Sequence, residues 1–355
     1  MDILEILYTR EFKKVTLNVR KLSFNTKKIL LLGPKGAGKS SMIYDYLSLR
    51  KRGSFLYIDF DDFRLKGVDI SEELPQFLQK YQINLLVLEN FNFNFEIPFC
   101  QEVIITTNRK TTLENFTILT LYPLDFEEFI SFESRYENME ATFSNFAVIG
   151  TFPALKRVSR EDFVNVYQIF LQKFAKNDLQ MHMLQLLSSK QGRTVSMHEL
   201  FLKIKLKHKI SKDTFYAYCK KLQDEYVLFL VEKFEKKTAV KKLYLIDFAL
   251  RSVLSFEKDF IKRFENIVFL ELLKRDKVFY YTDAIDFYLP SEKKAILTIP
   301  FLPLNMIEKK LERISSHLIS FGVLNVLVVT MEVEASYELQ SINYELIPFW
   351  NFATL

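Results

Sequence analysis

The sequence GPKGAGKS at residues 33–40 directly follows a short, unbroken apolar run, KILLLG at 28–33. It matches the phosphate-loop spacing of Gly, four residues, Gly, Lys and Ser. Glycines allow the backbone to turn so that its N–H groups face a phosphate, and the following helix directs its positive N-terminal end at the same anion. Because such a loop needs a buried strand before it and a helix after it, this motif constrains the fold more than any other feature of the chain.

The motif also assigns chemical roles to its side chains. We expect Lys39 to reach the β- and γ-phosphates of ATP and Ser40 to hold Mg²⁺. The predicted cofactors are therefore ATP and Mg²⁺. The residues predicted to contact the nucleotide are Gly33, Pro34, Lys35, Gly36, Ala37, Gly38, Lys39, Ser40 and Ser41.

Further short apolar runs have the length of buried strands, and helical patterns lie between them. Strands that alternate with helices pair in parallel through right-handed crossovers. We therefore predict an α/β fold with three layers over residues 1–124. The predicted strands are 28–33, 54–60, 83–89 and 102–107, and the predicted helices are 39–51 and 71–82.

Hydrolysis of ATP would also need a carboxylate at the end of a second strand, where it can organise Mg²⁺ and water. The run INLLVLE ends in Glu89, which we predict as a catalytic carboxylate and Mg²⁺ ligand; the alternative is a solvated acid at a strand end. The next residue, Asn90, cannot accept a proton at neutral pH. Asn108 follows the next strand and is predicted to orient the attacking water, unless it only ends that strand. ATP binding is thus supported better than turnover, and an ATPase activity is left open.

A group of acids follows the second predicted strand. We expect Asp59, Asp61 and Asp62 to form a solvated acidic turn. The alternative is that they act on Mg²⁺ through water molecules.

Positive charge is concentrated in one part of the chain. Residues 177–242 contain 14 Lys and Arg against 7 Asp and Glu, whereas the whole chain has a net charge of +5. A local excess of this kind suits a polyanionic partner.

The same part of the chain has a helix–turn–helix pattern at 195–224. Ser211 is predicted to cap the second helix, whose apolar residues recur on one face. With a strand-like ribbon at 227–234, this is the layout of a winged helix, whose second helix enters a major groove of double-stranded DNA. Lysines rather than arginines favour phosphate contact over base reading; the alternative is a packing module that binds a protein partner. The candidate nucleic-acid contacts are Lys203, Lys205, Lys207, Lys209, Lys212, Lys220 and Lys221.

Helical patterns after Pro123 predict a small helical lid, and the chain beyond residue 241 mixes strands with helices. The lid helices are predicted at 125–135, 138–148 and 160–176. The later strands are predicted at 242–246, 277–289, 294–299 and 323–330, and the later helices at 258–275 and 305–321.

Two acids in this last region, Glu265 and Asp286, have the placement of a nuclease's metal-binding pair. A metal-dependent nuclease would also need a third acid and a lysine on the next strand, to position water. Thr298 and Pro300 occupy those places in KAILTIPF, and neither binds metal strongly or activates water. We therefore expect a degenerate, non-catalytic nuclease-like site.

The composition indicates a cytoplasmic protein without a membrane partner. No apolar run approaches the length of a membrane span, and charged residues near the N-terminus interrupt any signal-peptide core. The two cysteines, Cys100 and Cys219, are expected to be reduced and buried, because two cysteines make neither a disulfide framework nor a zinc cluster.

Taken together, these segments resemble the prokaryotic AAA+-like P-loop ATPases that join a winged helix to a C-terminal domain of unknown function with a restriction-endonuclease-like fold. The order of the matching segments is more specific than any one of them. They are GPKGAGKS (33–40), LYPLDFEEF (121–129), GTFPAL (150–155), ISKDTFYAYCKKL (210–222), LYLIDFAL (243–250), FENIVFLELLKR (264–275) and YYTDAIDF (280–287).

The resemblance implies ATP at residues 33–41 and DNA contact through 203–221. The chain departs from the family at Glu89–Asn90, where Asp–Glu is usual, and at Thr298 and Pro300, where an acid and a lysine are usual. The expected function is a nucleotide-dependent conformational switch with slow hydrolysis; the alternative is a DNA-binding module with ATP as a conformational ligand only. The predicted domains are a P-loop domain (1–124), a helical lid (125–176), a winged helix (177–241) and a nuclease-like domain (242–355).

Overall fold

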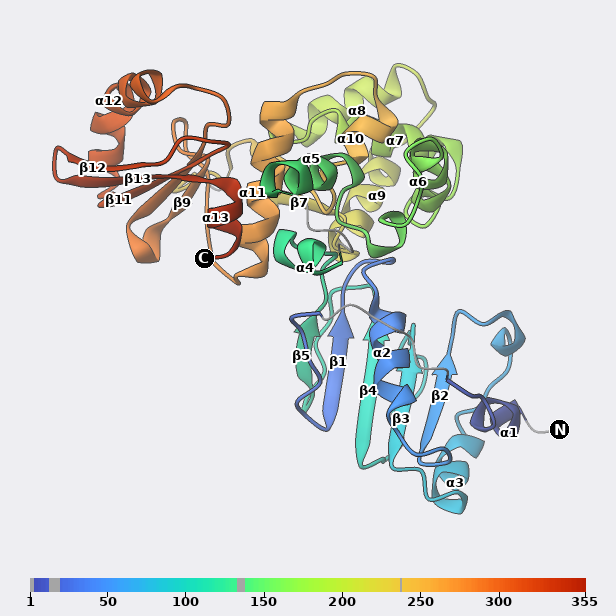
Figure 1. Cartoon of the computed structure of the whole chain (residues 1–355). Coiled ribbons are helices and arrows are strands. Elements are labelled where there is room, and N and C mark those ends of the chain that lie inside the picture. The colour runs from blue at the N-terminus through green and yellow to red at the C-terminus, as the bar shows by residue number, and fades with distance from the viewer. Residues whose placement is uncertain (1–2, 13–19, 133–137, 237) are drawn as a thin grey trace. The chain divides into compact units, whose positions relative to one another are not determined.

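The computed structural model describes residues 3–12, 20–132, 138–236 and 238–355. The chain forms two compact units (Figure 1). The first unit comprises Met1–Pro123 with Asp224–Tyr226, and the second comprises Leu124–Gln223 with Val227–Leu355.

The first unit contains a five-stranded sheet in the order β2-β3-β4-β1-β5, and every neighbouring pair is parallel (Figure 1). This confirms the predicted parallel α/β sheet and its four predicted strands. The fifth strand escapes prediction because its sequence, TILT, is too short and too exposed to form an apolar run. The strands are β1 (Lys28–Leu32), β2 (Phe55–Asp59), β3 (Leu85–Glu89), β4 (Glu102–Thr107) and β5 (Thr117–Thr120).

Helix α2 (Lys39–Ser48) packs through Ile43 and Leu47 against one face of this sheet, in a cluster that includes Leu31 and Val87. The next helix in the chain, α3 (Glu73–Lys80), connects β2 to β3, and α1 (Ile3–Tyr8) and a 3-10 turn, η1 (Phe63–Leu65), complete the helices described in this unit. Residues 90–101 and 108–116 contain no helix, so loops alone make the last two crossovers. The helical layers on the faces of this sheet therefore contain fewer helices, among the described residues, than the alternation of strands and helices predicts.

The second unit begins with three short helices where the sequence predicts a lid. Asp125 and Glu128 form a reciprocal capping box at the start of the first of them. The third ends earlier than predicted, and residues 133–135 of the first prediction lie outside the described residues. The helices are α4 (Phe126–Ser131), α5 (Met139–Ile149) and α6 (Phe163–Leu171), with a 3-10 turn, η2 (Pro153–Leu155), between the last two.

Three helices and a three-stranded antiparallel sheet follow, in the sheet order β6-β8-β7. Ser211 accepts the N–H of Thr214, which confirms its predicted capping role. The strand predicted at 242–246 is present as β8, but it pairs with β6 and β7 and so belongs to this small sheet. The elements are α7 (Asp178–Ser188), β6 (Arg193–Val195), α8 (Met197–Lys205), α9 (Lys212–Asp224), β7 (Leu228–Val231) and β8 (Lys241–Leu245).

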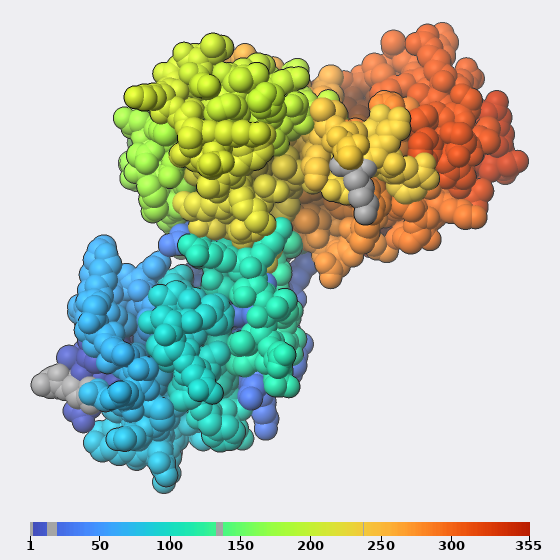
Figure 2. Space-filling model, turned by 180° about the vertical axis from the view of Figure 1, so that it is seen from behind, coloured from blue at the N-terminus to red at the C-terminus, as the bar shows by residue number. Residues whose placement is uncertain are grey.

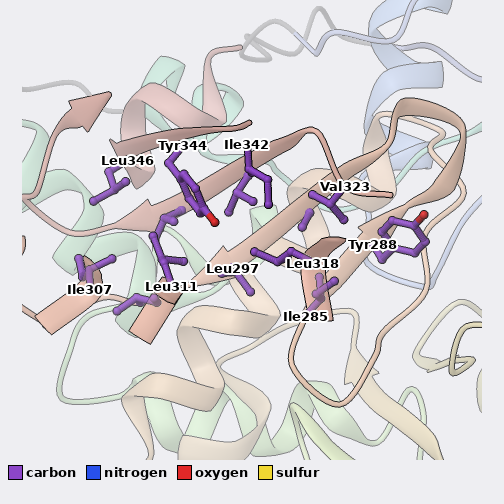
Figure 3. Packing of buried hydrophobic residues seen from close by; sticks show 14 residues of the cluster. Ile285, Tyr288, Leu297, Ile307, Leu311, Leu318, Val323, Ile342, Tyr344 and Leu346 are labelled. Atoms are coloured by element: carbon purple, nitrogen blue, oxygen red, sulfur yellow. The ribbon is translucent and has the colours of Figure 1, made fainter. Parts of the chain in front are cut away.

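The rest of the second unit is a mixed sheet in the order β12-β13-β11-β10-β9. Its three central strands are parallel and its two edge strands antiparallel. Ile307, Leu311 and Leu318 of α12 lie in the buried cluster that covers one face (Figure 3). The elements are α10 (Leu250–Leu254), α11 (Phe260–Lys274), β9 (Phe287–Leu289), η3 (Pro290–Glu292), β10 (Lys294–Thr298), α12 (Leu304–Ser320), β11 (Asn325–Thr330), β12 (Ala335–Leu339), β13 (Ile342–Pro348) and α13 (Phe349–Ala353).

The single strand predicted at 277–289 is wrong, because this segment folds back on itself. Thr282 accepts the N–H groups of Ala284 and Ile285 through its hydroxyl, which closes a tight turn. Tyr280 then pairs with Tyr288 across the turn, and only β9 continues as a strand of the large sheet.

The connection between β7 and β8 packs against this folded-back segment. Tyr281 donates its N–H to Glu232, and Phe234 donates its N–H to Tyr281. The Phe234 ring also packs against the buried cluster of the large sheet. Asn266 of α11 exchanges two hydrogen bonds with the backbone of Leu245 in β8. These contacts join the small sheet and the large sheet within one unit.

In the described ranges, no helix has both the length and the apolar composition needed to cross a membrane. Cys100 and Cys219 are both buried and free.

Candidate functional site

The phosphate loop adopts a backbone that favours glycine at three places. Gly33, Gly36 and Gly38 have φ angles of 141°, 88° and 102°. A Cβ atom on Gly33 would lie 2.1 Å from the carbonyl oxygen of Leu121. Gly38 is also the residue that precedes α2, so the loop leads directly into the N-terminus of this helix. Both the positive φ angles and the close backbone approach explain why the motif requires glycine here.

Lys39 lies inside this loop with only 6% of its surface exposed. Its Nζ donates to the carbonyl oxygens of Gly33 and Pro34, at 2.6 and 3.0 Å. Burial lowers the pKa of Lys39 to about 8, although the nearby charge of Glu89 acts in the opposite direction. The ammonium is therefore held by neutral carbonyls, which a phosphate oxygen can replace.

Glu89 lies at the end of β3 and is 2% exposed. The hydroxyl of Ser40 donates to one of its carboxylate oxygens, and the hydroxyl of Tyr57 donates to the other. Burial raises the pKa of Glu89, and the two hydroxyl hydrogen bonds offset this only in part. The structure thus brings the predicted Mg²⁺ ligands Ser40 and Glu89 into direct contact.

The residue after Glu89 is fixed by both neighbouring strands. Asn90 has a φ of 54°, and its N–H donates to the hydroxyl of Thr106 at 3.0 Å. Its side-chain amide donates to Asp59 at 2.8 Å. Asp59 is therefore linked to the end of β3, whereas Asp61 is exposed and pairs with Lys35 at 3.0 Å, as expected for a solvated turn.

Arg20 supports the loop from outside the motif. Its guanidinium donates to the carbonyl oxygens of Ala37 and Tyr122, at 2.8 and 2.6 Å. Neither Arg20 nor Tyr57 is predicted from the sequence, because each belongs to the site only through a contact distant in the chain. Tyr57 gives one signal: it carries a hydroxyl among the apolar residues that precede Asp59 in β2.

Asn108 follows β4 directly and is half-exposed. Within the described ranges, its side chain makes no hydrogen bond to the phosphate loop or to Glu89. Its role in positioning water therefore stays a prediction.

The residues at this edge of the sheet fit ATP and Mg²⁺ chemically. The loop offers backbone N–H groups and a lysine whose hydrogen bonds go to carbonyl oxygens. The Ser40 hydroxyl and the Glu89 carboxylate are the oxygen ligands that Mg²⁺ prefers, and Mg²⁺ usually completes its shell with phosphate and water. No group of three or more His, Cys, Asp or Glu side chains suited to a metal occurs in the described parts of the chain.

The two acids of the predicted nuclease-like site lie on either side of a lysine from β8. Lys242 Nζ is 2.6 Å from Glu265 Oε1 and 3.0 Å from Asp286 Oδ1. Lys262 donates to the other oxygen of Glu265 at 2.7 Å, and Thr298 donates its N–H and hydroxyl to the other oxygen of Asp286, both at 2.9 Å. All four carboxylate oxygens thus accept hydrogen bonds, and an ammonium occupies the position between the acids.

The electrostatics of this cluster favour the ion pairs. Burial alone would lower the pKa of Lys242, but Asp286 and Glu265 raise it to about 12. Burial would raise the pKa of Asp286, but Lys242 and the hydrogen bonds from Thr298 hold it below its ordinary value. The sequence predicts the two acids, but it gives only a weak signal for Lys242, a lysine at the start of an apolar run, and none for the hydrogen bonds from Lys262 and Thr298.

The candidate nucleic-acid residues lie on α8, on α9 and between them. The apolar face of α9 is buried through Phe215, Tyr218, Cys219 and Leu222, whereas Lys212 and Lys220 are exposed. Figure 2 shows this part of the chain, in yellow-green to yellow, at the surface of the second unit. Lys203 and Lys205 belong to α8, Lys207 and Lys209 to the connection, and Lys212, Lys220 and Lys221 to α9.

No family model matches this chain. The chain is 24% identical, over 357 aligned positions, to an uncharacterized protein of Methanocaldococcus jannaschii, and the alignment covers 84% of this chain and 80% of that protein. Among solved structures, it is similar to the Aeropyrum pernix ORC1 protein in complex with DNA, with 14% identity and a TM-score of 0.32 over 66% of this chain and 87% of that chain. Neither similarity assigns a function, which has to follow from the geometry of the chain's own residues.

Replacing Lys242 by methionine should destabilise the second unit. The change leaves the buried Glu265 beside Asp286 without the cation between them, which should lower the free energy of unfolding by about 3 kcal/mol. Urea unfolding followed by the fluorescence of Trp350, the single tryptophan and a residue of this unit, measures the loss.

Lys241→Met is the matched control, because Lys241 is the neighbour in the same strand and its side chain is 37% exposed. Its ion pair with Glu232 should contribute less than about 1 kcal/mol. Equal losses for the two variants would contradict the assignment of Lys242 as the counterion of the acid pair.

Proposed function

We propose that the protein binds ATP with Mg²⁺ at residues 33–41 and responds to the nucleotide as a conformational switch. The observation that carries this proposal is the buried ammonium of Lys39, enclosed by a loop of three positive-φ glycines beside the Ser40–Glu89 contact. ATP would supply the phosphates that the loop N–H groups and Lys39 bind, and Mg²⁺ would be held by Ser40 and Glu89.

The proposed conformational switch depends on hydrogen bonds of Lys39 and Ser40 that would be replaced by contacts with the nucleotide and Mg²⁺. Lys39 would give up the carbonyl oxygens of Gly33 and Pro34 for phosphate oxygens. Ser40 would give up its hydrogen bond to Glu89, which lies at the end of β3. Because Asn90 connects this end to Thr106 and Asp59, a shift of Glu89 would reach β4 and β2.

We further propose slow hydrolysis with Glu89 as the general base. A carboxylate whose pKa is raised by burial is a better proton acceptor near neutral pH than an ordinary one. The amide of Asn90 faces Asp59 and cannot take this role, so the carboxylate of Glu89 would act alone.

Lys39→Ala should weaken Mg²⁺–ATP binding by about tenfold or more, because it removes a charged hydrogen bond to phosphate. In the wild type, affinity should fall as the pH rises above about 8, since Lys39 must take up a proton to bind phosphate. It should also fall at acidic pH, as Glu89 becomes protonated and can no longer hold Mg²⁺. Titration calorimetry across this pH range measures both effects.

Lys35→Ala is the control for this experiment. Lys35 belongs to the loop, but its half-exposed side chain pairs with the exposed Asp61. The variant keeps the backbone N–H and should bind ATP as the wild type does. The proposal is contradicted if Lys39→Ala binds Mg²⁺–ATP with wild-type affinity.

Glu89→Gln should lose turnover. Its Mg²⁺–ATP affinity should fall as that of the wild type does at acidic pH, because a neutral side chain holds Mg²⁺ less well, but ATP should still bind through Lys39 and the loop N–H groups. The amide oxygen can still accept a hydrogen bond from one of the two hydroxyls that Glu89 binds, Ser40 or Tyr57. The amide cannot accept a proton, so the rate should fall by about a hundredfold or more. Single-turnover hydrolysis with Mg²⁺, with and without duplex DNA, measures the effect. An unchanged rate in the variant would contradict the role of Glu89 as the general base. If the wild type binds ATP without hydrolysing it, the proposal of hydrolysis fails and only the nucleotide-dependent switch remains.

We propose double-stranded DNA as a second ligand, bound through α9 in a winged-helix arrangement. The exposed lysines of α8 and α9 and the burial of the apolar face of α9 favour it. The connection between β7 and β8, which would be the wing, is packed against residues 280–288. Contact would therefore depend on α9 and not on the wing, and a protein partner on the same surface is the alternative.

Lys212→Glu and Lys220→Glu should each weaken duplex binding and reduce its dependence on salt, because each removes about one phosphate contact. Fluorescence anisotropy of a labelled duplex across a salt series measures this. Lys258→Glu reverses the same charge on an exposed residue of the same unit outside 203–221, and it should have little effect. No duplex binding at low salt would eliminate DNA as the ligand of this surface.

A further inference from the structure

A cavity of about 830 Å³ lies in the second unit between β6 and α8 on one side and α12 with residues 281–286 on the other. Its lining is strongly basic and includes two residues that carry hydroxyl groups, Thr194 and Ser196. We call it the basic cavity. Its cationic residues are Lys190, Arg193, Lys203, Lys242, Lys262 and Lys310.

The acids of the lining are fewer, and two of the three are paired. Asp286 pairs with Lys242 at 3.0 Å, and Asp283 pairs at 2.6 Å with Lys233, which is not part of the lining. The third acid, Glu199, is exposed. The basic cavity therefore keeps an excess of positive charge after its internal ion pairs are formed.

Three of the cations have no ion pair within the described ranges: Lys190, Lys203 and Lys310. Burial lowers the pKa of Lys190, and the charges of Lys203 and Arg193 add to this effect. Arg193 pairs with Asp259 at 2.9 Å, so it is compensated in part. Like charges held together in this way are stabilised by an anion bound between them.

Two further cations are fixed in place. Lys242 and Lys262 are both held by Glu265, and Lys242 also by Asp286, as described above. Their positions are set before any ligand arrives, which reduces the entropic cost of binding. Because Lys242 occupies the position between the two acids, a phosphate here would meet ammonium groups and not a metal ion.

We propose that the basic cavity binds the phosphate groups of a nucleic-acid strand or of a free nucleotide or polyphosphate. Ammonium, guanidinium and hydroxyl donors are the groups that recognise phosphate, and the volume exceeds the need of a single phosphate group. Lys203 belongs both to this lining and to the lysine-rich segment 203–209, so a strand could continue from one to the other. A nucleic-acid strand and a small phosphate ligand would be bound by the same donors. They differ in that only a strand would extend beyond the basic cavity.

The test uses the full chain carrying Lys39→Ala, so that the phosphate loop does not contribute. A labelled single-stranded oligonucleotide of about 12 nucleotides and inorganic pyrophosphate are the two probes. Either probe should bind at low salt, and Lys310→Glu and Lys190→Gln should each weaken that binding by about fivefold or more. Binding of pyrophosphate without the oligonucleotide would assign a small ligand, and tighter binding of the oligonucleotide would assign a strand.

Lys309→Glu is the matched control, because Lys309 is the exposed neighbour of Lys310 in α12 and does not line the cavity. It should change affinity by less than about twofold. Lys212→Glu separates this site from the proposed duplex surface on α9 and should also have little effect on either probe. The proposal is overturned if neither probe binds at low salt, or if Lys309→Glu weakens binding as much as Lys310→Glu.

Discussion

Parallel pairing of β3, β4 and β1 places the ends of these strands at one edge of the first sheet, and the candidate nucleotide site depends on that placement. The phosphate loop leaves β1 at this edge, and Glu89 ends β3 there. The contact between Ser40 and Glu89 follows, although 49 positions separate them in the chain. The order of strands explains why the loop motif and one carboxylate form a single site.

The second unit depends on a different interaction, the ammonium of Lys242 between Glu265 and Asp286. This ion cluster joins β8 of the small sheet to α11 and to the segment before β9. Two hydrogen bonds between Asn266 and Leu245 and the stacking of Tyr244 on Phe269, with ring centroids 4.2 Å apart, support the same junction. The small and the large sheet are thus packed together in one unit. The predicted domain boundary at residue 241 falls at the start of β8, which is a strand of the small sheet.

Most long elements could be predicted, since they bury an apolar run or an apolar face that is visible locally. The strands β1, β2, β3 and β4 and the helices α2, α9, α11 and α12 belong to this group. The failures involve elements whose stability comes from distant partners. β5 is a short, half-exposed edge strand, and the segment 277–289 turns at Thr282 through side-chain hydrogen bonds that no apolar pattern records. The sequence predicts the strand β8, but it does not predict that this strand pairs with β6 and β7.

By itself, the sequence determined the phosphate loop, because the glycines at 33, 36 and 38 and the adjacent Lys39 and Ser40 act through local backbone geometry. It also shows directly that Thr298 and Pro300 stand at the positions where a nuclease-like site would need a third acid and a lysine. Only the tertiary structure decided which groups face those residues. Arg20, Tyr57 and Lys242 act across long separations in the chain, where strand order and helix packing set the distance between charges, and local pattern carries no information about that distance.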